Sequence, residues 1–421
     1  MSTARELRSE IAVLSSRHMV DRFYLPQLDG LRFVAFLAVF VCHFLHSAGR
    51  VSSPWESAIA DAGAFGVDLF FILSSFLITS LLLREQAREG RARIGAFWVR
   101  RALRIWPLYF TVVAVAVVIT RPPAWYVLGL LTFTTNWALV HRMYDSPLNV
   151  LWSLALEEQF YLAWPLCLAL LRGRGLPAVA LGLIGTALFS RARLLDDLGS
   201  LTDYALFIHP LGRLEPLALG ILLAWGWSRW RSSRALRPKW TGVAAVAIGW
   251  AAVTGLIRFG TDAGTVLFWP SMWVYPAVDL ILASMLGVVL VAGGGLLAHP
   301  VLVYLGRISY GLYVFHQVAI GEVLLQLGGV PWPLRLGLSL GLTVGLAALS
   351  YAWLEEPFLR LKARFTYVQS GGPPTRRPWT RSPQKPSEAL SPVDFHVQSP
   401  PQPHYPPRPV EPAVEYRWPG G

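Results

Sequence analysis

Residues 28–43 read LDGLRFVAFLAVFVCH, in which ten mostly apolar residues separate Arg32 from His43. An α-helix needs about 20 apolar residues to cross about 30 Å of hydrocarbon, and this stretch continues to residue 48. Nine further stretches have the same character, which predicts an all-α, polytopic integral membrane protein with about ten transmembrane helices. The predicted spans are 31–48, 65–83, 105–121, 151–171, 176–195, 204–228, 240–258, 275–295, 308–327 and 334–354.

Composition agrees with this fold class. Of 421 residues, 54% are hydrophobic and 15% are charged, against roughly 25% charged in a soluble domain. The net charge of +12 comes from arginines in short loops, where they set membrane orientation, so we expect no nucleic-acid partner. Cys42 and Cys167 both lie in apolar stretches, which favours packing roles over a disulfide.

The basic loops predict the topology. Residues 84–104 contain seven arginines, and the loops 172–175 and 229–239 are also basic, so all three should be cytoplasmic. They share one side only if 124–140 is a re-entrant or interfacial segment, not a crossing. This arrangement predicts a multi-pass protein of the plasma or inner membrane, with both termini cytoplasmic.

Three regions follow from this pattern. Residues 1–24 form a polar cytoplasmic segment without the apolar run of a signal peptide. Residues 25–365 form the membrane domain. Residues 366–421 are predicted to be a disordered proline-rich tail, because 14 of the 31 prolines follow residue 370 and little apolar pattern remains.

Three ionisable side chains on three different predicted spans fall at similar depth in the membrane. At 1.5 Å per residue, His43 lies roughly 16 Å beyond Arg32, His316 about 12 Å above Ile308, and Glu157 about 21 Å above Leu171. Such groups are costly in lipid and are functional candidates by default. A histidine with a carboxylate partner suits general-base catalysis, and the alternative is a structural hydrogen-bond pair.

Two other charged features border the spans. Arg101 and Arg104 are three residues apart and share a helix face; they suit bidentate phosphate binding, or alternatively they anchor the protein to lipid headgroups. Asp68 lies about one turn inside the outer face, where a structural helix-start role competes with lining an acceptor entrance.

Six motifs in order resemble the acyltransferase-3 family of bacterial integral-membrane O-acyltransferases, over about residues 26–360. They are LDGLRFVAFLAVFVCH (28–43), GVDLFFILSSFLI (66–78), FWVRRALRIWPLY (97–109), WSLALEEQFYLAWP (152–165), GRISYGLYVFH (306–316) and LEEPF (354–358). One departure is Ser75, which stands where the family usually has glycine.

The resemblance implies transfer of an acyl group from acyl-CoA to a hydroxyl, usually on a sugar of a glycan or a glycosylated metabolite. It implies that His43 is catalytic, with Glu157 and His316 as its candidate supports, and that Arg32, Arg101 and Arg104 bind the donor. Other matching positions are substrate-side or structural: Asp68, Ser153, Ser309, Tyr310 and Glu355. Acyl-CoA is then a co-substrate, the acceptor is glycan-like, membrane lipid surrounds the protein, and we expect no bound cofactor.

Alternatives remain open at the level of sequence. His43 acts either as a general base or through a transient acyl-histidine. A transporter or flippase of glycolipid or polyketide-like substrates also uses intramembrane ionisable residues, although it needs no phosphate site at Arg101 and Arg104. A different acyl donor, such as a phospholipid, is a third interpretation. No metal site is expected, because the sequence has no HExxH motif or cysteine cluster.

Overall fold

The computed structural model describes residues 23–171, 175–197, 203–229, 238–260 and 268–365. These residues form helices and connecting loops, with no strand among them. The predicted segments 1–24 and 366–421 lie outside the described residues, except for residues 23 and 24.

The first half of the chain supplies the helices that carry four of the six motifs quoted above. They are α2 (Pro26–Ser47), α3 (Pro54–Ala64), α4 (Gly66–Glu89), α5 (Ile94–Thr120), α6 (Ala124–Leu131), α7 (Thr135–His141), η1 (Pro147–Leu151) and α8 (Trp152–Leu171). Local signals fix several starts: a proline stands at the beginning of α2, and Ser53 and Glu56 form a reciprocal capping box at α3, which satisfies otherwise free backbone N–H groups.

The second half continues the helical pattern. Its elements are α9 (Leu176–Asp197), α10 (Asp203–Ile208), η2 (Leu211–Arg213), α11 (Glu215–Arg229), α12 (Thr241–Gly260), α13 (Phe268–Ala292), η3 (Leu296–Ala298), α14 (Pro300–Arg307), α15 (Ser309–Gln326), α16 (Trp332–Ser350), the π-helical turn η4 (Tyr351–Glu355), α17 (Glu356–Lys362) and η5 (Ala363–Phe365).

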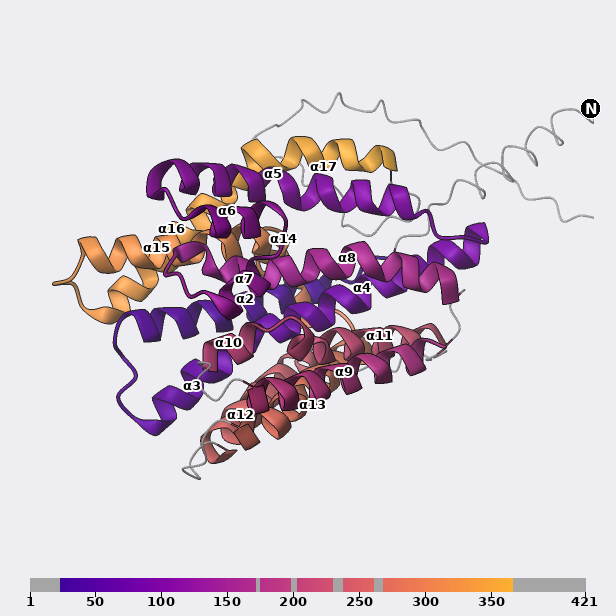
Figure 1. The fold of residues 1–421 in the computed structure, drawn as a ribbon, viewed down its shortest axis with the longest axis horizontal. Helices are drawn as coiled ribbons and strands as arrows, with labels where there is room; N and C mark the ends of the chain where they lie inside the picture. Colours follow the sequence, from indigo (N-terminus) through magenta and orange to yellow (C-terminus); the bar gives the residue numbers. More distant parts are fainter. Residues whose placement is uncertain (1–22, 172–174, 198–202, 230–237, 261–267, 366–421) are drawn as a thin grey trace, which may run out of the picture. The chain divides into compact units, whose positions relative to one another are not determined.

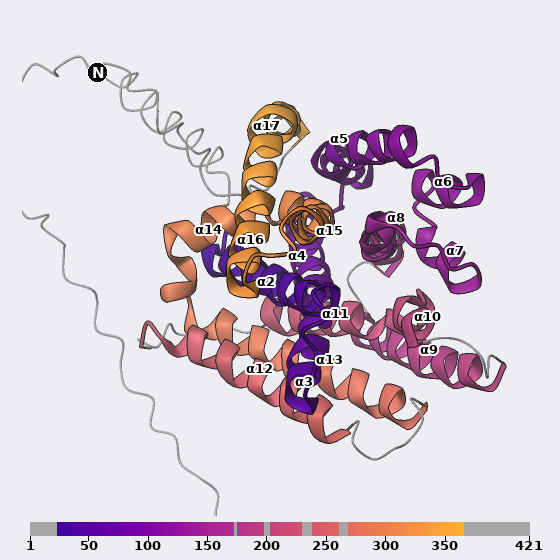
Figure 2. The same cartoon turned by 90° about the vertical axis from the view of Figure 1, so that its left-hand side faces the viewer.

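Helices α2 and α4 occupy the centre of the described part. Figures 1 and 2 show α5 and α17 on one side of them, and α9, α11, α12 and α13 on the other. Helices α4 and α11 approach closely, because Gly220 of α11 has no side chain: a Cβ there would stand 1.9 Å from Ser75 Oγ. Ser75, the departure from the family pattern, is thus accommodated because the facing helix carries a glycine.

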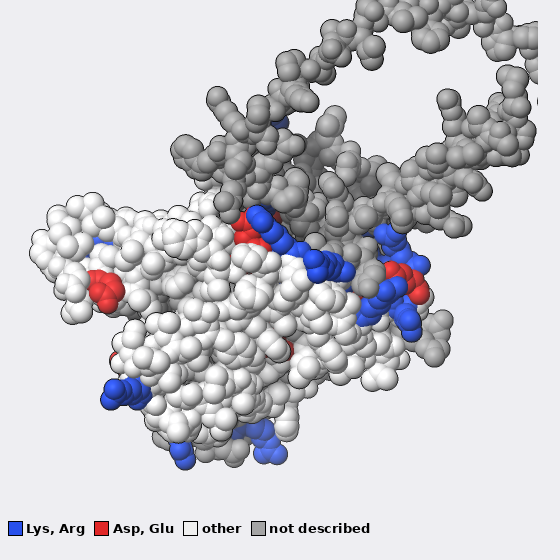
Figure 3. Space-filling view, turned by 90° about the horizontal axis from the view of Figure 1, so that it is seen from above, with Lys and Arg blue, Asp and Glu red and all other residues white. Residues whose placement is uncertain are grey.

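The exterior is apolar, as a membrane protein requires. Large hydrophobic side chains such as Val118, Leu170 and Trp353 are 75–84% exposed. In Figure 3 most of the viewed face is white, and charged side chains gather mainly toward its right-hand end. Exposing such a large apolar surface to water is unfavourable, whereas lipid accommodates it. The prediction of a multi-pass helical membrane protein is therefore confirmed.

The number of spans differs from the prediction. Among the described residues, seven helical segments are long and apolar enough to cross a membrane, or eight if α14 and α15, which meet at a 72° bend, form one span. Two predicted spans do not meet this measure: 176–195 corresponds to α9, which includes Arg191 and Arg193, and 204–228 is divided among α10, η2 and α11.

The re-entrant or interfacial placement of the segment 124–140 stays a prediction, but its local structure is clear. It forms two short helices, α6 and α7, separated by Phe133 with a positive φ of 55°. Gln159 Nε2 of α8 donates to the Phe133 carbonyl oxygen at 2.7 Å. Protein groups therefore satisfy the non-helical backbone at this break.

Candidate active site

A pair of histidines joins α2 to α15. His43 Nδ1 and His316 Nε2 are 3.0 Å apart, and the ring centroids are 5.0 Å apart. His316 is fully buried, and its Nδ1 lies 2.5 Å from the carbonyl oxygen of Tyr313. The two histidines that the depth argument placed near each other are therefore in direct contact.

The hydrogen bonds assign the protons of a neutral pair. A carbonyl oxygen only accepts, so His316 Nδ1 carries a proton and its Nε2 accepts. His43 Nδ1 must then donate to His316, which leaves the lone pair of His43 on Nε2. An imidazole held in one tautomer with a free nitrogen is the form that a general base requires.

We call the space that His43 lines the histidine cavity. It has a volume of about 1040 Å³ and mixes aromatic with polar walls. Residues on these walls include His43, His46, Asp61, Tyr144, Asp145, Asn149, Trp152, Tyr204, Phe207, Tyr275, Tyr313 and Gln317. Its size and mixed lining suit a bulky polar ligand.

His46 lines the same cavity but belongs to a different pair. Its Nδ1 lies 2.9 Å from the Cys42 carbonyl oxygen, and its Nε2 lies 3.3 Å from Asp61 Oδ1. His46 and Asp61 are each about half exposed. Among the described residues, no group of three or more His, Cys, Asp or Glu side chains is arranged to hold a metal ion.

A second, narrower space of about 90 Å³, the arginine pocket, contains the predicted donor residues. Arg32 of α2 and Arg101 and Arg104 of α5 line it. The Arg101 guanidinium lies 5.0 Å from the ring centroid of Tyr161. Ser309 and Tyr310 also line this pocket. Three guanidiniums around one pocket are suited to binding an anion.

Glu157 belongs to the arginine pocket and not to the histidine pair. Ser74 Oγ donates to its Oε1 at 3.0 Å, and the Tyr161 hydroxyl donates to its Oε2 at 2.5 Å. The depth argument placed Glu157 level with the histidines, but it did not fix which way the side chain points. The expected carboxylate partner of His43 is therefore replaced by His316.

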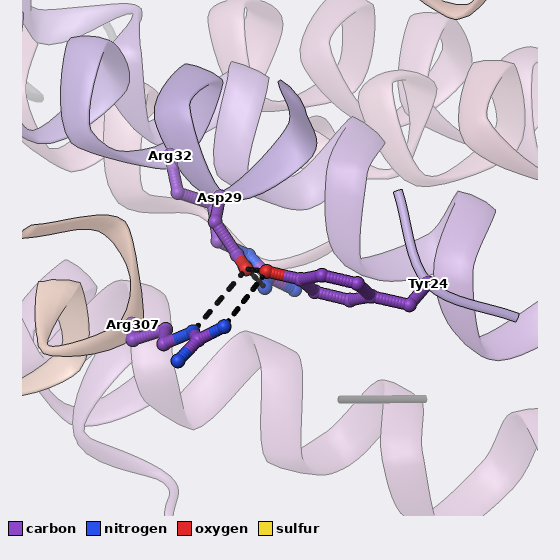
Figure 4. Close-up of polar contacts among 4 residues, drawn as sticks. All are labelled: Tyr24, Asp29, Arg32 and Arg307. Carbon is purple, nitrogen blue, oxygen red and sulfur yellow. Dashed lines mark hydrogen bonds and ion pairs between the residues drawn. The ribbon is translucent and has the colours of Figure 1, made fainter. Parts of the chain in front are cut away.

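Arg32 is held from the other side by Asp29. Arg32 Nη1 lies 3.2 Å from Asp29 Oδ1, and the Tyr24 hydroxyl donates to Asp29 Oδ2 at 2.9 Å. Figure 4 shows Arg307 reaching the same group, where its Nη2 donates to the Tyr24 hydroxyl at 3.1 Å. Burial raises the pKa of Tyr24, so its hydroxyl remains a donor to the carboxylate.

Asp68 lies in a buried ion pair away from both cavities. It is fully buried and forms an ion pair with Arg213 of η2, whose guanidinium also lies 4.3 Å from the centroid of the Phe207 ring. A second buried ion pair joins Arg191 to Glu215. Asp68 does not line either cavity, which favours the structural interpretation over a place at an acceptor entrance.

The remaining predicted residues lie at the edges of the site. Ser153 lines the arginine pocket, and its Oγ is 2.7 Å from the Tyr313 hydroxyl. Glu355 is buried in η4 and accepts from Ser350 Oγ at 3.3 Å. The sequence analysis did not single out Tyr313, Tyr161, Ser74 or Arg213. Tyr313 precedes His316 by one helical turn, which was the available signal.

A family model described as an acyltransferase domain matches residues 25–352, which places the chain in a class of acyltransferases. The chain belongs to the acyltransferase-3 family, as its motifs predicted. No solved structure matches the chain significantly.

The chain is similar to three curated relatives of bacterial origin. The chain is 29% identical over 369 residues to the peptidoglycan O-acetyltransferase OatA of Listeria monocytogenes, covering 80% of this chain and 56% of that protein. It is 30% identical over 358 residues to a provisionally named peptidoglycan O-acetyltransferase of Bacillus subtilis, covering 79% and 55%. A provisionally named O-acetyltransferase of Staphylococcus aureus (strain COL) is 28% identical over 367 residues, covering 80% and 57%. The chain thus spans little more than half the length of these relatives.

Proposed function

We propose that this protein transfers an acyl group from acyl-CoA to a hydroxyl of a glycan or glycosylated acceptor within the membrane. The observation that carries the proposal is the His43–His316 pair, whose free nitrogen belongs to the residue that lines the large cavity. Membership of an acyltransferase family supports the reaction class.

The arginine pocket is the proposed donor site. Arg101 and Arg104, supported by Arg32, would hold the phosphates of acyl-CoA, because planar guanidiniums bind phosphate oxygens in pairs. Glu157 would position this group through Tyr161, which donates to the carboxylate and lies beneath the Arg101 guanidinium. Acyl-CoA serves as a co-substrate and leaves as free CoA after each turnover.

The histidine cavity is the proposed acceptor site. Its aromatic walls suit the flat faces of sugar rings, and its Asp145, Asn149 and Gln317 side chains suit hydroxyl groups. The name of the Listeria relative makes peptidoglycan the first acceptor to test.

In the proposed step, the oxygen of the acceptor hydroxyl attacks the thioester carbonyl carbon. His43 Nε2 accepts the proton of this hydroxyl as the new bond forms. The carbon–sulfur bond then breaks, and the proton passes from His43 to the departing sulfur of CoA. His316 acts as a positioning residue, since its Nε2 accepts from His43 Nδ1 and fixes the tautomer.

We also propose ten spans, with the donor site and both termini cytoplasmic. The charges of Arg191 in α9 and Arg213 in η2 do not oppose crossing, because both are buried in ion pairs inside the protein. The basic residues of the 84–104 loop then lie on the cytoplasmic side. The membrane is the plasma or inner membrane of the cell. A transporter or flippase is less favoured, because it gives no role to three arginines around one pocket.

The test is acyl transfer by the purified protein in nanodiscs, with radiolabelled acetyl-CoA and peptidoglycan fragments. His43→Ala should lower transfer by about 10²- to 10⁴-fold, the usual contribution of a general base. His46→Ala is the matched control, since His46 lies on the same helix and lines the same cavity but pairs with Asp61 instead of His316; it should lower transfer far less than His43→Ala does. Near-normal transfer by a folded His43→Ala protein would contradict the proposal.

A further inference from the structure

Two residues line both the arginine pocket and the histidine cavity: Val67 of α4 and Tyr313 of α15. The two spaces therefore share a wall rather than lying in separate parts of the protein. The ring of Tyr313 is buried in this wall, with its centroid 5.4 Å from that of His316 and 6.1 Å from that of Phe70, which lines the arginine pocket.

The side chain of Tyr313 is fastened across the boundary. Its hydroxyl donates to the carbonyl oxygen of Val150, a histidine-cavity residue, at 2.9 Å. The same hydroxyl lies 2.7 Å from Ser153 Oγ, and Ser153 lines the arginine pocket. Ser153 Oγ is also 3.1 Å from the Val150 carbonyl oxygen, so the two hydroxyl protons serve three short contacts. These three groups hold the phenol ring where the spaces meet.

The backbone of Tyr313 reaches the histidine pair. Its carbonyl oxygen accepts from His316 Nδ1, and His316 contacts His43. The residue that stands between the two spaces is therefore linked through two hydrogen bonds to the proposed base.

We propose that Tyr313, together with Val67, is a partition between donor and acceptor that opens only for the acyl group. This inference rests on the proposed function. With the Tyr313 hydroxyl on Ser153 and Val150, the passage is closed, and the water of the large cavity is kept from a thioester in the arginine pocket. Release of this hydroxyl lets the acyl carbon meet the acceptor oxygen beside His43, while the nucleotide part of CoA remains with the arginines.

The partition matters because water competes with the acceptor. Attack by an acceptor hydroxyl gives an ester and the CoA thiol, and attack by water gives a carboxylic acid and the same thiol. In both cases the attacking oxygen loses a proton and the departing sulfur gains one. A site that excludes water until the acceptor is bound avoids this loss.

The first experiment measures acyl-CoA hydrolysis without acceptor and transfer with acceptor, using [¹⁴C]acetyl-CoA and peptidoglycan fragments with protein in nanodiscs. Tyr313→Ala should raise the ratio of hydrolysis to transfer by about tenfold or more, because it removes the ring that separates water from the thioester. Tyr310→Ala is the matched control: Tyr310 is also fastened by its hydroxyl, to the Ile105 carbonyl at 2.9 Å, but lines only the arginine pocket. It should lower both reactions without changing their ratio.

Val67→Trp tests the same partition in the opposite direction, and it serves if Tyr313→Ala fails to insert. A larger side chain in the shared wall should lower transfer by about tenfold or more, while CoA affinity stays within about twofold. An unchanged hydrolysis-to-transfer ratio in folded Tyr313→Ala, or normal transfer in folded Val67→Trp, would overturn the partition. If the wild type itself neither hydrolyses nor transfers the acetyl group, the proposed function fails instead.

Discussion

His43, the proposed general base, pairs with a second histidine, His316, and not with a carboxylate. In many hydrolases a carboxylate orients the catalytic imidazole; here a second imidazole does so, and a main-chain carbonyl orients that second ring in turn. A neutral chain of this kind avoids placing another charge in the bilayer interior. His316 therefore orients His43 without adding a negative charge.

The arginines give a prediction at the residue scale. Arg101→Ala should raise the KM for acyl-CoA by about 10- to 100-fold, with a smaller change in kcat, because a hydrogen bond to a charged group contributes about 1.5–3 kcal/mol. The measurement is steady-state transfer at several acetyl-CoA concentrations, together with direct CoA binding. Arg360→Ala is the control, since this arginine of α17 is exposed and pairs only with Glu356 four residues away. Equal KM values for Arg101→Ala and wild type would remove the donor assignment.

Residue types and membrane depths predicted which residues belong to the site. They did not predict which of these residues contact each other. His43 and His316 were placed together because both lie in the middle of their spans. Glu157 is predicted to lie with them on the same ground. The rise per residue gives the depth of a side chain along the helix axis, but it does not give the direction in which the side chain points. Ser74 and Tyr161, which bind its carboxylate, lie on different helices from the histidines.

At the scale of elements, buried charges link segments that are distant in sequence. Arg213 lies in a one-turn 3₁₀ segment that breaks a predicted span, and it pairs with Asp68 of α4, 145 residues away. The sequence analysis predicts 204–228 as one apolar span, and nothing local in the sequence identifies Asp68 as the partner of Arg213. The break in the span is stabilised because the Arg213 guanidinium is buried in the protein interior, where it pairs with the Asp68 carboxylate.

The ion pair between Asp68 and Arg213 predicts a stability change. Arg213→Leu should destabilise the protein by about 3–5 kcal/mol, because it leaves a buried carboxylate without its partner. Replacing both residues by leucine should recover part of this loss. Unfolding in detergent, followed by tryptophan fluorescence and denaturant titration, measures the difference.

Arg360→Leu provides the comparison for this pair. The Arg360 side chain is 68% exposed, and an exposed ion pair contributes about 0–1 kcal/mol. If Arg213→Leu were no more destabilising than Arg360→Leu, the buried pair would have no structural role, and Asp68 would return to consideration as an acceptor-side residue.

At the scale of the whole molecule, apolar length predicted the helices better than it predicted the spans. Most predicted spans match a long helix within several residues at each end. The exceptions are α9 and the broken segment α10–η2–α11, where arginines interrupt the apolar run. Contacts formed only after folding decide whether such charges are tolerated, so a hydropathy count alone does not settle these crossings.

The orientation of the protein in the membrane is testable, and it decides from which side of the membrane acyl-CoA reaches the arginine pocket. In a Cys42→Ala, Cys167→Ala background, Ser52→Cys and Arg91→Cys each place one thiol in an exposed loop, the first between α2 and α3 and the second between α4 and α5. A membrane-impermeant maleimide should label Ser52→Cys in intact cells and Arg91→Cys only after permeabilisation, since the basic 84–104 loop remains inside. The reverse labelling pattern would place the arginine pocket on the outer side, away from cytoplasmic acyl-CoA, and would contradict the proposed direction of transfer even if the histidine assignments held.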